Sequence, residues 1–310
     1  MKKVVILTGP TAVGKSSLVY QLPQNTPIEI IGADSRQVYR DLQIGTAGPT
    51  EEELKLFPHH LVYHVDLTEK YSAGRFVKEA NQKIQEIHDR GKIPLIVGGT
   101  FFYIKSLFVG IAEEPPENPA LLQEIQRMEN KIAREKLEKL DPISFRRIPA
   151  QDEFRIKRAL YYCLAAKQPF SSAPRIGSIK DKYHIVAFAI LRDRKDLYWR
   201  AEERISVMFQ KGLIEETARA YEKVPTSPAL SSIGYLEIVQ YCQENQISAS
   251  EMLKRKQEIQ QNTEQLIARN TRRFIKRQLT WIRATKELKK IDYACAFSHL
   301  SDSLIQKEAI

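Results

Sequence analysis

The chain has 310 residues, of which 43% are hydrophobic, and its formal net charge is +10. This length and apolar content suffice for a full core and for two domains, which excludes a disordered chain. No apolar run approaches the ~20 residues that span a bilayer, and no secretory signal opens the sequence, so we expect a cytoplasmic protein without a membrane segment.

A glycine-rich loop follows the apolar run Val4–Leu7 and leads into a helix-like stretch. Its glycines let backbone N–H groups turn toward an anion, Lys15 adds a positive charge, and Ser16 offers a hydroxyl to a magnesium ion. The loop therefore predicts a phosphate site made by Gly9, Pro10, Thr11, Ala12, Val13, Gly14, Lys15 and Ser16.

Residues 1–112 alternate apolar strands with helical periodicity, a pattern typical of a parallel α/β sheet. We predict strands at 3–8, 28–33 and 93–97, and a crossover helix from Ala73 that is closed by Gly91. The fold class we expect is thus an α/β protein with a parallel sheet like that of P-loop NTPases.

The composition changes at the acidic, proline-rich segment 113–119, where we place the start of a second domain. Residues 113–180 show helical spacing of apolar residues and then a loop-like stretch, which predicts a helical insertion. Residues 181–310 return to the core: a strand at 184–191 rejoins the first sheet, and a basic helical part follows.

An acidic residue stands in an unusual place relative to the phosphate loop. Enzymes of this loop class that act on nucleotides usually carry an acid at the end of a later strand. Here the strand at 93–97 runs into Gly98, Gly99 and Thr100, and the acid, Asp34, follows the strand at 28–33. This arrangement indicates that the loop and the acid take different roles here from those in the enzymes that act on nucleotides.

Positive charge is concentrated near the C-terminus. Residues 254–290 hold twelve lysines and arginines against three glutamates. Such a segment either attracts a polyanion or forms a solvated helix face. The cysteines at 163, 242 and 295 form no paired motif, so we interpret all three as small buried residues. His59 and His60 lack further ligands at metal-site spacing, and we predict packing or substrate contact for them.

Several motifs occur together in one order. They are Asp34-Ser35-Arg36-Gln37, Ile44-Gly45-Thr46-Ala47, Pro58-His59-His60-Leu61, Gly98-Gly99-Thr100 with Tyr103, Arg158-Ala159-Leu160, Gly234-Tyr235 with Glu237, and Lys276-Arg277-Gln278-Leu279-Thr280-Trp281-Ile282-Arg283. With the phosphate loop, this set resembles the tRNA dimethylallyltransferase family over about residues 3–288.

The resemblance implies transfer of a dimethylallyl group from its diphosphate to N6 of adenosine 37, in tRNAs that read codons starting with U. It implies Mg²⁺ as cofactor, the tRNA anticodon stem-loop and dimethylallyl diphosphate as partners, and a monomer. The catalytic residues would be Asp34 as general base, Thr100 bound to the same amine or positioning the base, and Lys15 at the diphosphate.

The resemblance also implies further contacts. Arg200 and Arg204 lie one helical turn apart, and either could bind the diphosphate. Trp281 could stack on a base or anchor the core. The tRNA contacts would be Asp34, Ser35, Arg36, Gln37, Thr100, Arg155, Arg158, Gly234, Tyr235, Lys276, Arg277, Gln278, Trp281 and Arg283.

The chain departs from the family pattern at Leu122, Phe154, Tyr161 and Leu236, all on the side expected to contact tRNA. Three other functions fit parts of the pattern: an adenylate dimethylallyltransferase acting on a free nucleotide, a P-loop small-molecule kinase, and an RNA-binding protein with a relic loop. Competition by AMP, turnover of ATP, and binding without transfer would distinguish them.

Overall fold

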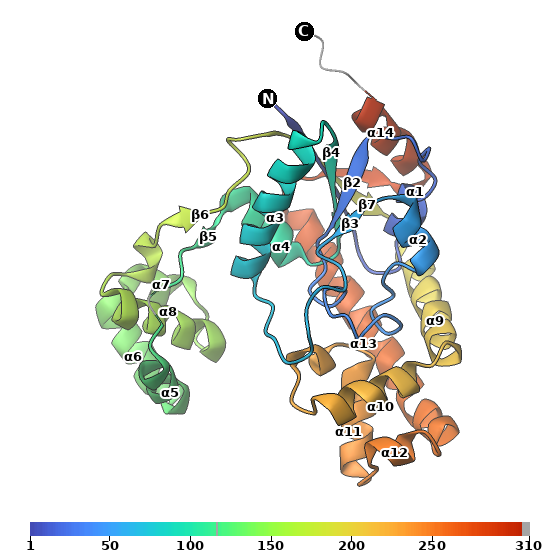
Figure 1. The fold of residues 1–310 in the computed structure, drawn as a ribbon. Helices are drawn as coiled ribbons and strands as arrows, with labels where there is room; N and C mark the ends of the chain where they lie inside the picture. Colours follow the sequence, from blue (N-terminus) through green and yellow to red (C-terminus); the bar gives the residue numbers. More distant parts are fainter. Residues whose placement is uncertain (116, 306–310) are drawn as a thin grey trace. The chain divides into compact units, whose positions relative to one another are not determined.

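The computed structural model describes residues 1–115 and 117–305 (Figure 1). The described chain groups into two compact units, one formed by Met1–Lys105 with the chain from Lys180 onward, the other by Ser106–Ile179. Helix α4 (Phe101–Val109) begins in the first unit and ends in the second. None of the helices in the described stretches combines the length and apolar character that crossing a bilayer requires.

The first unit is built on a parallel sheet whose described strands have the order β3-β2-β4-β1-β7-β8. The strands are β1 (Lys3–Thr8), β2 (Ile28–Gly32), β3 (His59–His60), β4 (Ile93–Gly98), β7 (His184–Leu191) and β8 (Lys289–Asp292). Val5 of β1 pairs with Leu95 on one side and Val186 on the other, so β1 is central. The α/β fold class and the return of the strand at 184–191 to the sheet are confirmed.

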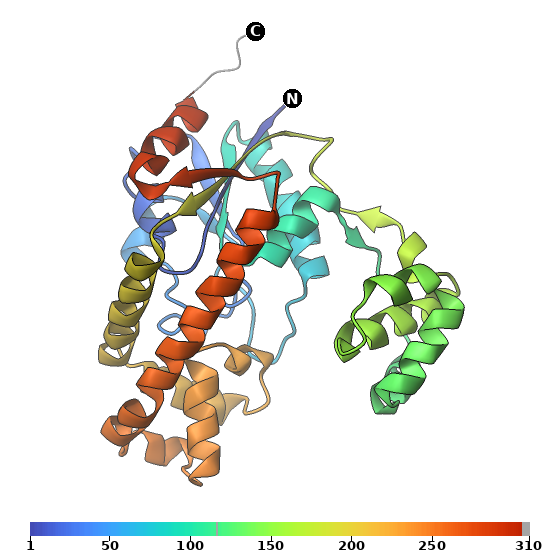
Figure 2. The same cartoon turned by 180° about the vertical axis from the view of Figure 1, so that it is seen from behind.

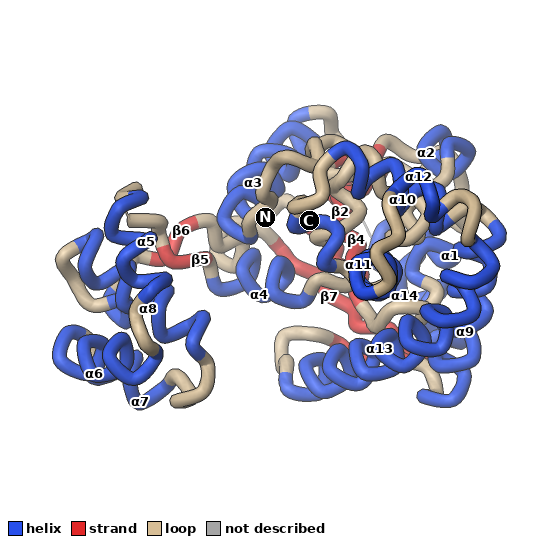
Figure 3. Tube along the Cα trace, turned by 90° about the horizontal axis from the view of Figure 1, so that it is seen from below, coloured by secondary structure: helices blue, strands red, loops and turns tan. Residues whose placement is uncertain are grey.

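Helices cover both faces of this sheet (Figure 3). Those of the first unit are α1 (Lys15–Val19), α2 (Glu51–Leu56), α3 (Ala73–Asp89), α9 (Arg194–Gln210), α10 (Leu213–Lys223), α11 (Tyr235–Glu244), α12 (Ala249–Met252), α13 (Lys256–Ala284) and α14 (Tyr293–Ile305). Seen from below, α3 and α13 lie on opposite sides of the strands. Because successive residues of a strand point to opposite faces, Val5 and Leu7 share a core with α13.

The long helix α13 runs from the sheet to α11 and α12 (Figure 2) and contributes to two cores. Ile275 and Leu279 near its C-terminus pack with the sheet residues Val5 and Leu7. Ile259 and Ile267 nearer its N-terminus pack into a second cluster with residues of α9 to α12. One face of α13 is therefore fixed over its length, and its charged residues remain on the exposed side.

The second unit is helical and has a core of its own. Its helices are α5 (Pro119–Arg127), α6 (Asn130–Leu140), α7 (Pro142–Arg147) and α8 (Glu153–Ala166). The short strands β5 (Ile111–Ala112) and β6 (Arg175–Ile176) pair antiparallel. Ile125, Leu137, Ile156 and Leu160 are buried together between the helices.

Some details differ from the sequence expectations. The crossover helix spans Ala73–Asp89, with Gly91 at a φ of 72°, as predicted. Strands β3 and β8 were not predicted, because β3 has two residues and β8 reads Lys-Lys-Ile-Asp, which has no apolar pattern. The expectation that every cysteine is buried is wrong for Cys295, which lies exposed on α14.

Candidate active site

The phosphate loop connects β1 to α1 and is bent by Gly14, which has a φ of 96°. A Cβ atom at Gly14 would lie 2.8 Å from the Tyr293 ring, so a larger residue is excluded there. The Lys15 ammonium donates to the carbonyl oxygens of Gly9 and Pro10, each over 3.0 Å. The Lys15 side chain, which we expect to face an anion, is thus held by hydrogen bonds to the backbone of the phosphate loop.

Side chains from α13, from α9 and from just before α9 hold the loop from outside. Arg192 Nε donates to Val13 O over 2.9 Å, and Arg200 Nε donates to Ala12 O over 3.0 Å. Gln278, 3% exposed, accepts from Thr11 N at 2.9 Å and donates to Gly99 O at 3.0 Å. These contacts tie the phosphate loop to the segment after β4.

Two cations adjoin the loop in a desolvated environment. Burial by the surrounding protein lowers the pKa of Lys15 to about 8; Asp34 opposes this shift and Arg204 adds to it. Arg204 donates to the Thr11 hydroxyl over 2.5 Å, while its Nε atom is buried and has no partner among the described residues. Burial also lowers the pKa of Arg204, and Asp34 opposes the shift. An unpaired buried donor here favours an anionic ligand.

Asp34 sits in a tight turn after β2. Its Oδ1 accepts from Arg36 N at 2.9 Å and from Gln37 N at 3.4 Å. Ser35 N donates to the Thr100 hydroxyl over 3.0 Å. The ends of β2 and β4 are neighbours in the sheet, so Asp34 and Thr100 meet at the same edge.

Two of the cavities lined by described residues meet at this edge. The loop cavity, about 480 Å³, is lined by the phosphate loop, Ser16, Trp199, Arg200 and Gln278 among others. The Thr100 cavity, about 300 Å³, is lined by Thr100, Ser35, Arg36 and the segment 231–234 among others. Both are lined by Thr11, Asp34, Thr46, Gly99, Arg204 and Phe274. Two ligands, one in each cavity, would come into contact beside Asp34.

The predicted RNA-contacting residues of α13 take different positions. Lys276, Arg277 and Arg283 are exposed, and Arg277 lines the Thr100 cavity. Gln278 is buried between the phosphate loop and Gly99. Trp281 stacks on Phe101 with ring centroids 4.4 Å apart and is partly exposed, which places its ring in a packed pair.

The remaining predicted residues of the first unit line or support the Thr100 cavity. Arg36 Nη1 donates to Pro228 O over 2.9 Å, and Gly234 lines the cavity. Tyr235 is fully buried, and its hydroxyl donates to Glu216 over 2.6 Å. Its side chain therefore holds other elements and faces no cavity of the site.

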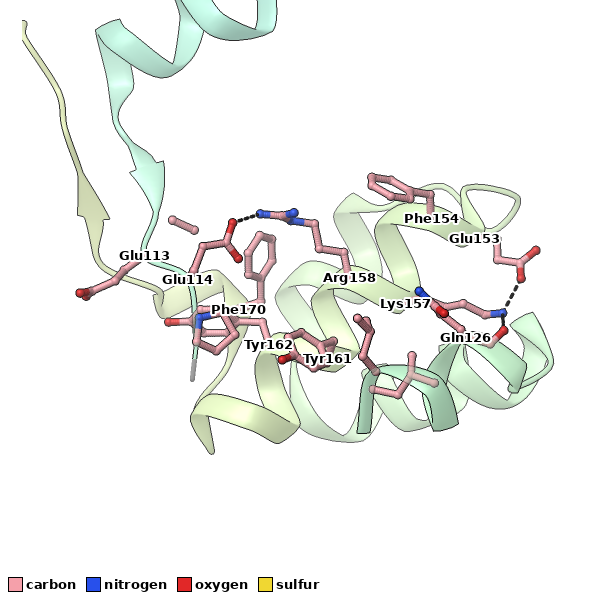
Figure 4. Close-up of a pocket in the computed structure, with 14 residues that line it drawn as sticks. Glu113, Glu114, Gln126, Glu153, Phe154, Lys157, Arg158, Tyr161, Tyr162 and Phe170 are labelled. Carbon is pink, nitrogen blue, oxygen red and sulfur yellow. Dashed lines mark hydrogen bonds and ion pairs between the residues drawn. The ribbon is translucent and has the colours of Figure 1, made fainter. Parts of the chain in front are cut away.

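Arg155 and Arg158 belong to the second unit, where each has an acidic partner. Arg158 donates to Glu114 Oε1 over 2.8 Å (Figure 4), and Arg155 pairs with Asp152 over 3.0 Å. Both arginines remain exposed.

A cavity of about 650 Å³ in the second unit contains three of the positions that depart from the family pattern. Leu122, Phe154 and Tyr161 all line it, with Tyr162 and Phe170. Figure 4 labels the four aromatic residues of this set. Phe154 is 75% exposed. Aromatic and apolar side chains thus gather around a single cavity of the second unit.

The few protein oxygen atoms near the loop fit a magnesium ion that is coordinated mainly by phosphate oxygens of a bound substrate. Ser16, whose hydroxyl is a hard oxygen donor, lines the loop cavity. Within residues 1–115 and 117–305, no group of three His, Cys, Asp or Glu side chains could hold a metal. His59 and His60 are bonded instead to Tyr20 and Glu29.

Sequence reasoning missed several residues of the site. Arg192 supports the loop, Phe274 lines both cavities, and Glu216 binds the backbone of residues 43–45. Arg192 directly follows the predicted strand, which was an available signal. Glu216 and Phe274 lie in ordinary amphipathic helices, where nothing in the sequence marks them.

The chain matches known proteins over most of its length. Residues 37–285 match the protein family described as IPP transferase. The chain is 39% identical to the tRNA dimethylallyltransferase of Carboxydothermus hydrogenoformans over 298 residues, covering 94% of this chain and 92% of that protein. It is 37% identical to that of Geobacter sulfurreducens over 306 residues, covering 96% and 94%.

Solved structures are similar over nearly the whole chain. One is the full-length tRNA isopentenylpyrophosphate transferase of Bacillus halodurans, with a TM-score of 0.67, 28% identity, and 98% of this chain and 97% of that chain covered. Another is a eukaryotic dimethylallyltransferase acting on tRNA, with a TM-score of 0.79, 25% identity, and coverage of 99% and 82%. The chain belongs to the IPP transferase family, that of the tRNA dimethylallyltransferases.

Proposed function

We propose that this protein transfers a dimethylallyl group from dimethylallyl diphosphate to N6 of adenosine 37 in tRNAs that read codons starting with U. Diphosphate is the leaving group. The observation that carries the proposal is the meeting of the loop cavity and the Thr100 cavity at Asp34. The loop cavity would bind the phosphates and the Thr100 cavity the acceptor, and Asp34 lines both. The chain also belongs to a family whose members are named tRNA dimethylallyltransferases.

The diphosphate lies in the loop cavity. Backbone N–H groups of the phosphate loop, the Lys15 ammonium and the guanidinium groups of Arg200 and Arg204 surround it. Of the two arginines, Arg204 has the unpaired buried Nε and reaches both cavities, whereas Arg200 already holds the loop through Ala12. Arg204 therefore binds the oxygens nearest the transferred carbon, and Arg200 shapes the loop.

The adenine enters the Thr100 cavity after leaving the base stack. Its N6 atom attacks C1 of the dimethylallyl group, the C1–O bond breaks, and diphosphate departs with the electron pair. Asp34 accepts the proton that N6 gives up. Thr100 fixes the turn that carries Asp34, through its bond to Ser35.

Magnesium is the cofactor in this proposal. Ser16 would hold the ion together with phosphate oxygens of the substrate, because protein ligands are few there. When bound, it would neutralise negative charge on the leaving diphosphate.

The RNA partner is the anticodon stem-loop, whose phosphates meet the exposed face of α13 at Lys276, Arg277 and Arg283. Arg155 and Arg158 add contacts from the second unit. The proposal keeps residues 113–180 as an insertion between the two parts of the core. The proposal includes a monomer in the cytoplasm. Size-exclusion chromatography with light scattering would test the oligomeric state.

The experiment is a transfer assay. Purified protein, Mg²⁺, labelled dimethylallyl diphosphate and unmodified tRNA should give labelled tRNA, with the product located on adenosine 37 by mass spectrometry of nuclease digests. Free AMP should not compete. Transfer to AMP in preference to tRNA would support the adenylate enzyme, and ATP turnover without prenyl transfer would support a kinase.

A further inference from the structure

Glu216 on α10 is a buried carboxylate, 4% exposed, that lines neither the loop cavity nor the Thr100 cavity. Oε2 accepts from the N–H groups of Gln43 at 2.8 Å and Ile44 at 2.9 Å. Oε1 accepts from Gly45 N at 2.9 Å and from the Tyr235 hydroxyl at 2.6 Å. Burial of a carboxylate is costly unless such donors surround it, so Glu216 and this loop fix each other's position.

The loop that Glu216 holds forms a wall of the active site. Thr46, directly after the bonded residues, lines both cavities. Gln37 Nε2 donates to Thr46 O at 3.2 Å and to Ala47 O at 3.1 Å. The backbone N–H of Gln37 donates in turn to Asp34 Oδ1 at 3.4 Å. A continuous set of contacts therefore runs from Glu216 to the turn that carries Asp34.

Tyr235 connects the same carboxylate to the opposite wall. A Cβ atom added to Gly45 would lie 2.4 Å from the Tyr235 ring, so the loop and the start of α11 are in close contact. Tyr235 directly follows the segment 231–234, which lines the Thr100 cavity. Glu216 thus joins two walls of that cavity, the loop at 45–46 and the segment at 231–234.

The phosphate loop depends on other residues. Side chains of other elements that bond the loop are those of Arg192, Arg200, Arg204 and Gln278. The hydrogen bonds of Glu216 go instead to residues 43–45 and Tyr235. We propose that Glu216 is a positioning residue that sets the shape of the Thr100 cavity and hence the use of the RNA acceptor, while the diphosphate site remains intact. This inference rests on the proposed function.

The test is Glu216→Gln, which keeps the side-chain volume and removes the charge. Transfer is measured with tRNA varied at saturating donor and with dimethylallyl diphosphate varied at saturating tRNA. We expect kcat/KM for tRNA to fall roughly 10- to 100-fold, the range for removal of hydrogen bonds to a charged group. The KM for dimethylallyl diphosphate should stay within about twofold, because the hydrogen bonds of the phosphate loop do not change.

Glu215→Gln is the matched control. Glu215 is the preceding residue, and its carboxylate pairs with Lys256 at the surface over 2.8 Å. Both kinetic parameters of this variant should stay within about twofold of wild type. A parallel titration of each variant with dimethylallyl diphosphate, followed by calorimetry, measures donor binding without RNA.

Tyr235→Phe provides a milder variant should Glu216→Gln fail to fold. It removes one donor to Glu216 and keeps the ring beside Gly45, so kcat/KM for tRNA should fall about 3- to 10-fold. Unchanged kcat/KM for tRNA in the folded variants would overturn the inference, as would equal losses for both substrates. Absence of transfer by the wild-type protein would instead contradict the proposed function.

Discussion

The backbone N–H of Ser35 donates to the hydroxyl of Thr100 over 3.0 Å, beside Asp34. This bond joins the ends of β2 and β4, which are adjacent in the sheet. It gives a physical reason for a hydroxyl at the position where related loop enzymes carry an acid.

Thr100→Val removes this hydroxyl at nearly constant volume. Ser35 N then has no acceptor and the Asp34 turn loosens, so we expect kcat to fall by about 10-fold. Thr100→Ser restores the acceptor and should retain most of the activity. Single-turnover transfer to tRNA measures both, and a valine variant as fast as wild type would rule out this role.

We expect the binding of dimethylallyl diphosphate to depend on pH, because the pKa of Lys15 is lowered. Burial lowers its pKa to about 8, so the ammonium is charged below this value and neutral above it. Diphosphate binding needs the charge, so the KM for dimethylallyl diphosphate should be flat near pH 7 and should rise by up to about 10-fold per unit above pH 8.

Lys15→Met is the control for this titration. It should bind the donor weakly at every pH, and its KM should show no change between about pH 7 and 9. A wild-type KM that stays constant through this range would show that the charge of Lys15 does not govern donor binding.

We expect the hydrogen bonds of Gln278 to contribute to the free energy of unfolding. Gln278→Leu leaves Thr11 N and Gly99 O without their present partners, and should lower the free energy of unfolding by about 1–3 kcal/mol. Gln265→Leu, at an exposed position of the same helix, should change it by about 0.5 kcal/mol or less. Urea denaturation compares the two; equal midpoints would argue against the bridge.

The exposed cations of α13 predict a salt dependence. Replacing Lys276, Arg277 or Arg283 by Gln should weaken tRNA binding and reduce the slope of log Kd against log salt by about one for each phosphate that is no longer neutralised. Lys70→Gln, on an exposed loop outside this helix, should leave the slope unchanged. Slopes identical to wild type in all three variants would place the RNA elsewhere.

Much of the fold follows from local pattern. The strands at 3–8, 93–98 and 184–191 are apolar runs next to turn residues, and they form where the sequence predicts. The order of strands in the sheet and the short strand β8 depend on tertiary pairing, because β8 carries no apolar alternation of its own.

The candidate site was predictable only in part. Residues of the phosphate loop, Asp34 and Thr100 stand at strand ends, where sequence position already fixes the edge of the sheet they share. Glu216 and Gln278 were not recognisable as supports, because the backbone groups that they bind lie more than 170 positions away in the chain. Such contacts arise from the packing of α10 and α13 and leave no local signal.

We propose that Asp34, where the two cavities meet, accepts the proton from the acceptor amine. Asp34→Asn keeps an oxygen for the N–H groups of Arg36 and Gln37 but cannot take the proton. The assay belongs near pH 7, because loss of the carboxylate would lower the pKa of Lys15 further.

The decisive measurement is therefore the single-turnover rate of dimethylallyl transfer to tRNA by Asp34→Asn, together with its Kd values for tRNA and dimethylallyl diphosphate. We expect the rate to fall at least about 100-fold, as for loss of a general base, with both Kd values within about twofold of wild type. A variant that retains more than about a tenth of the wild-type rate would show that Asp34 is not the proton acceptor.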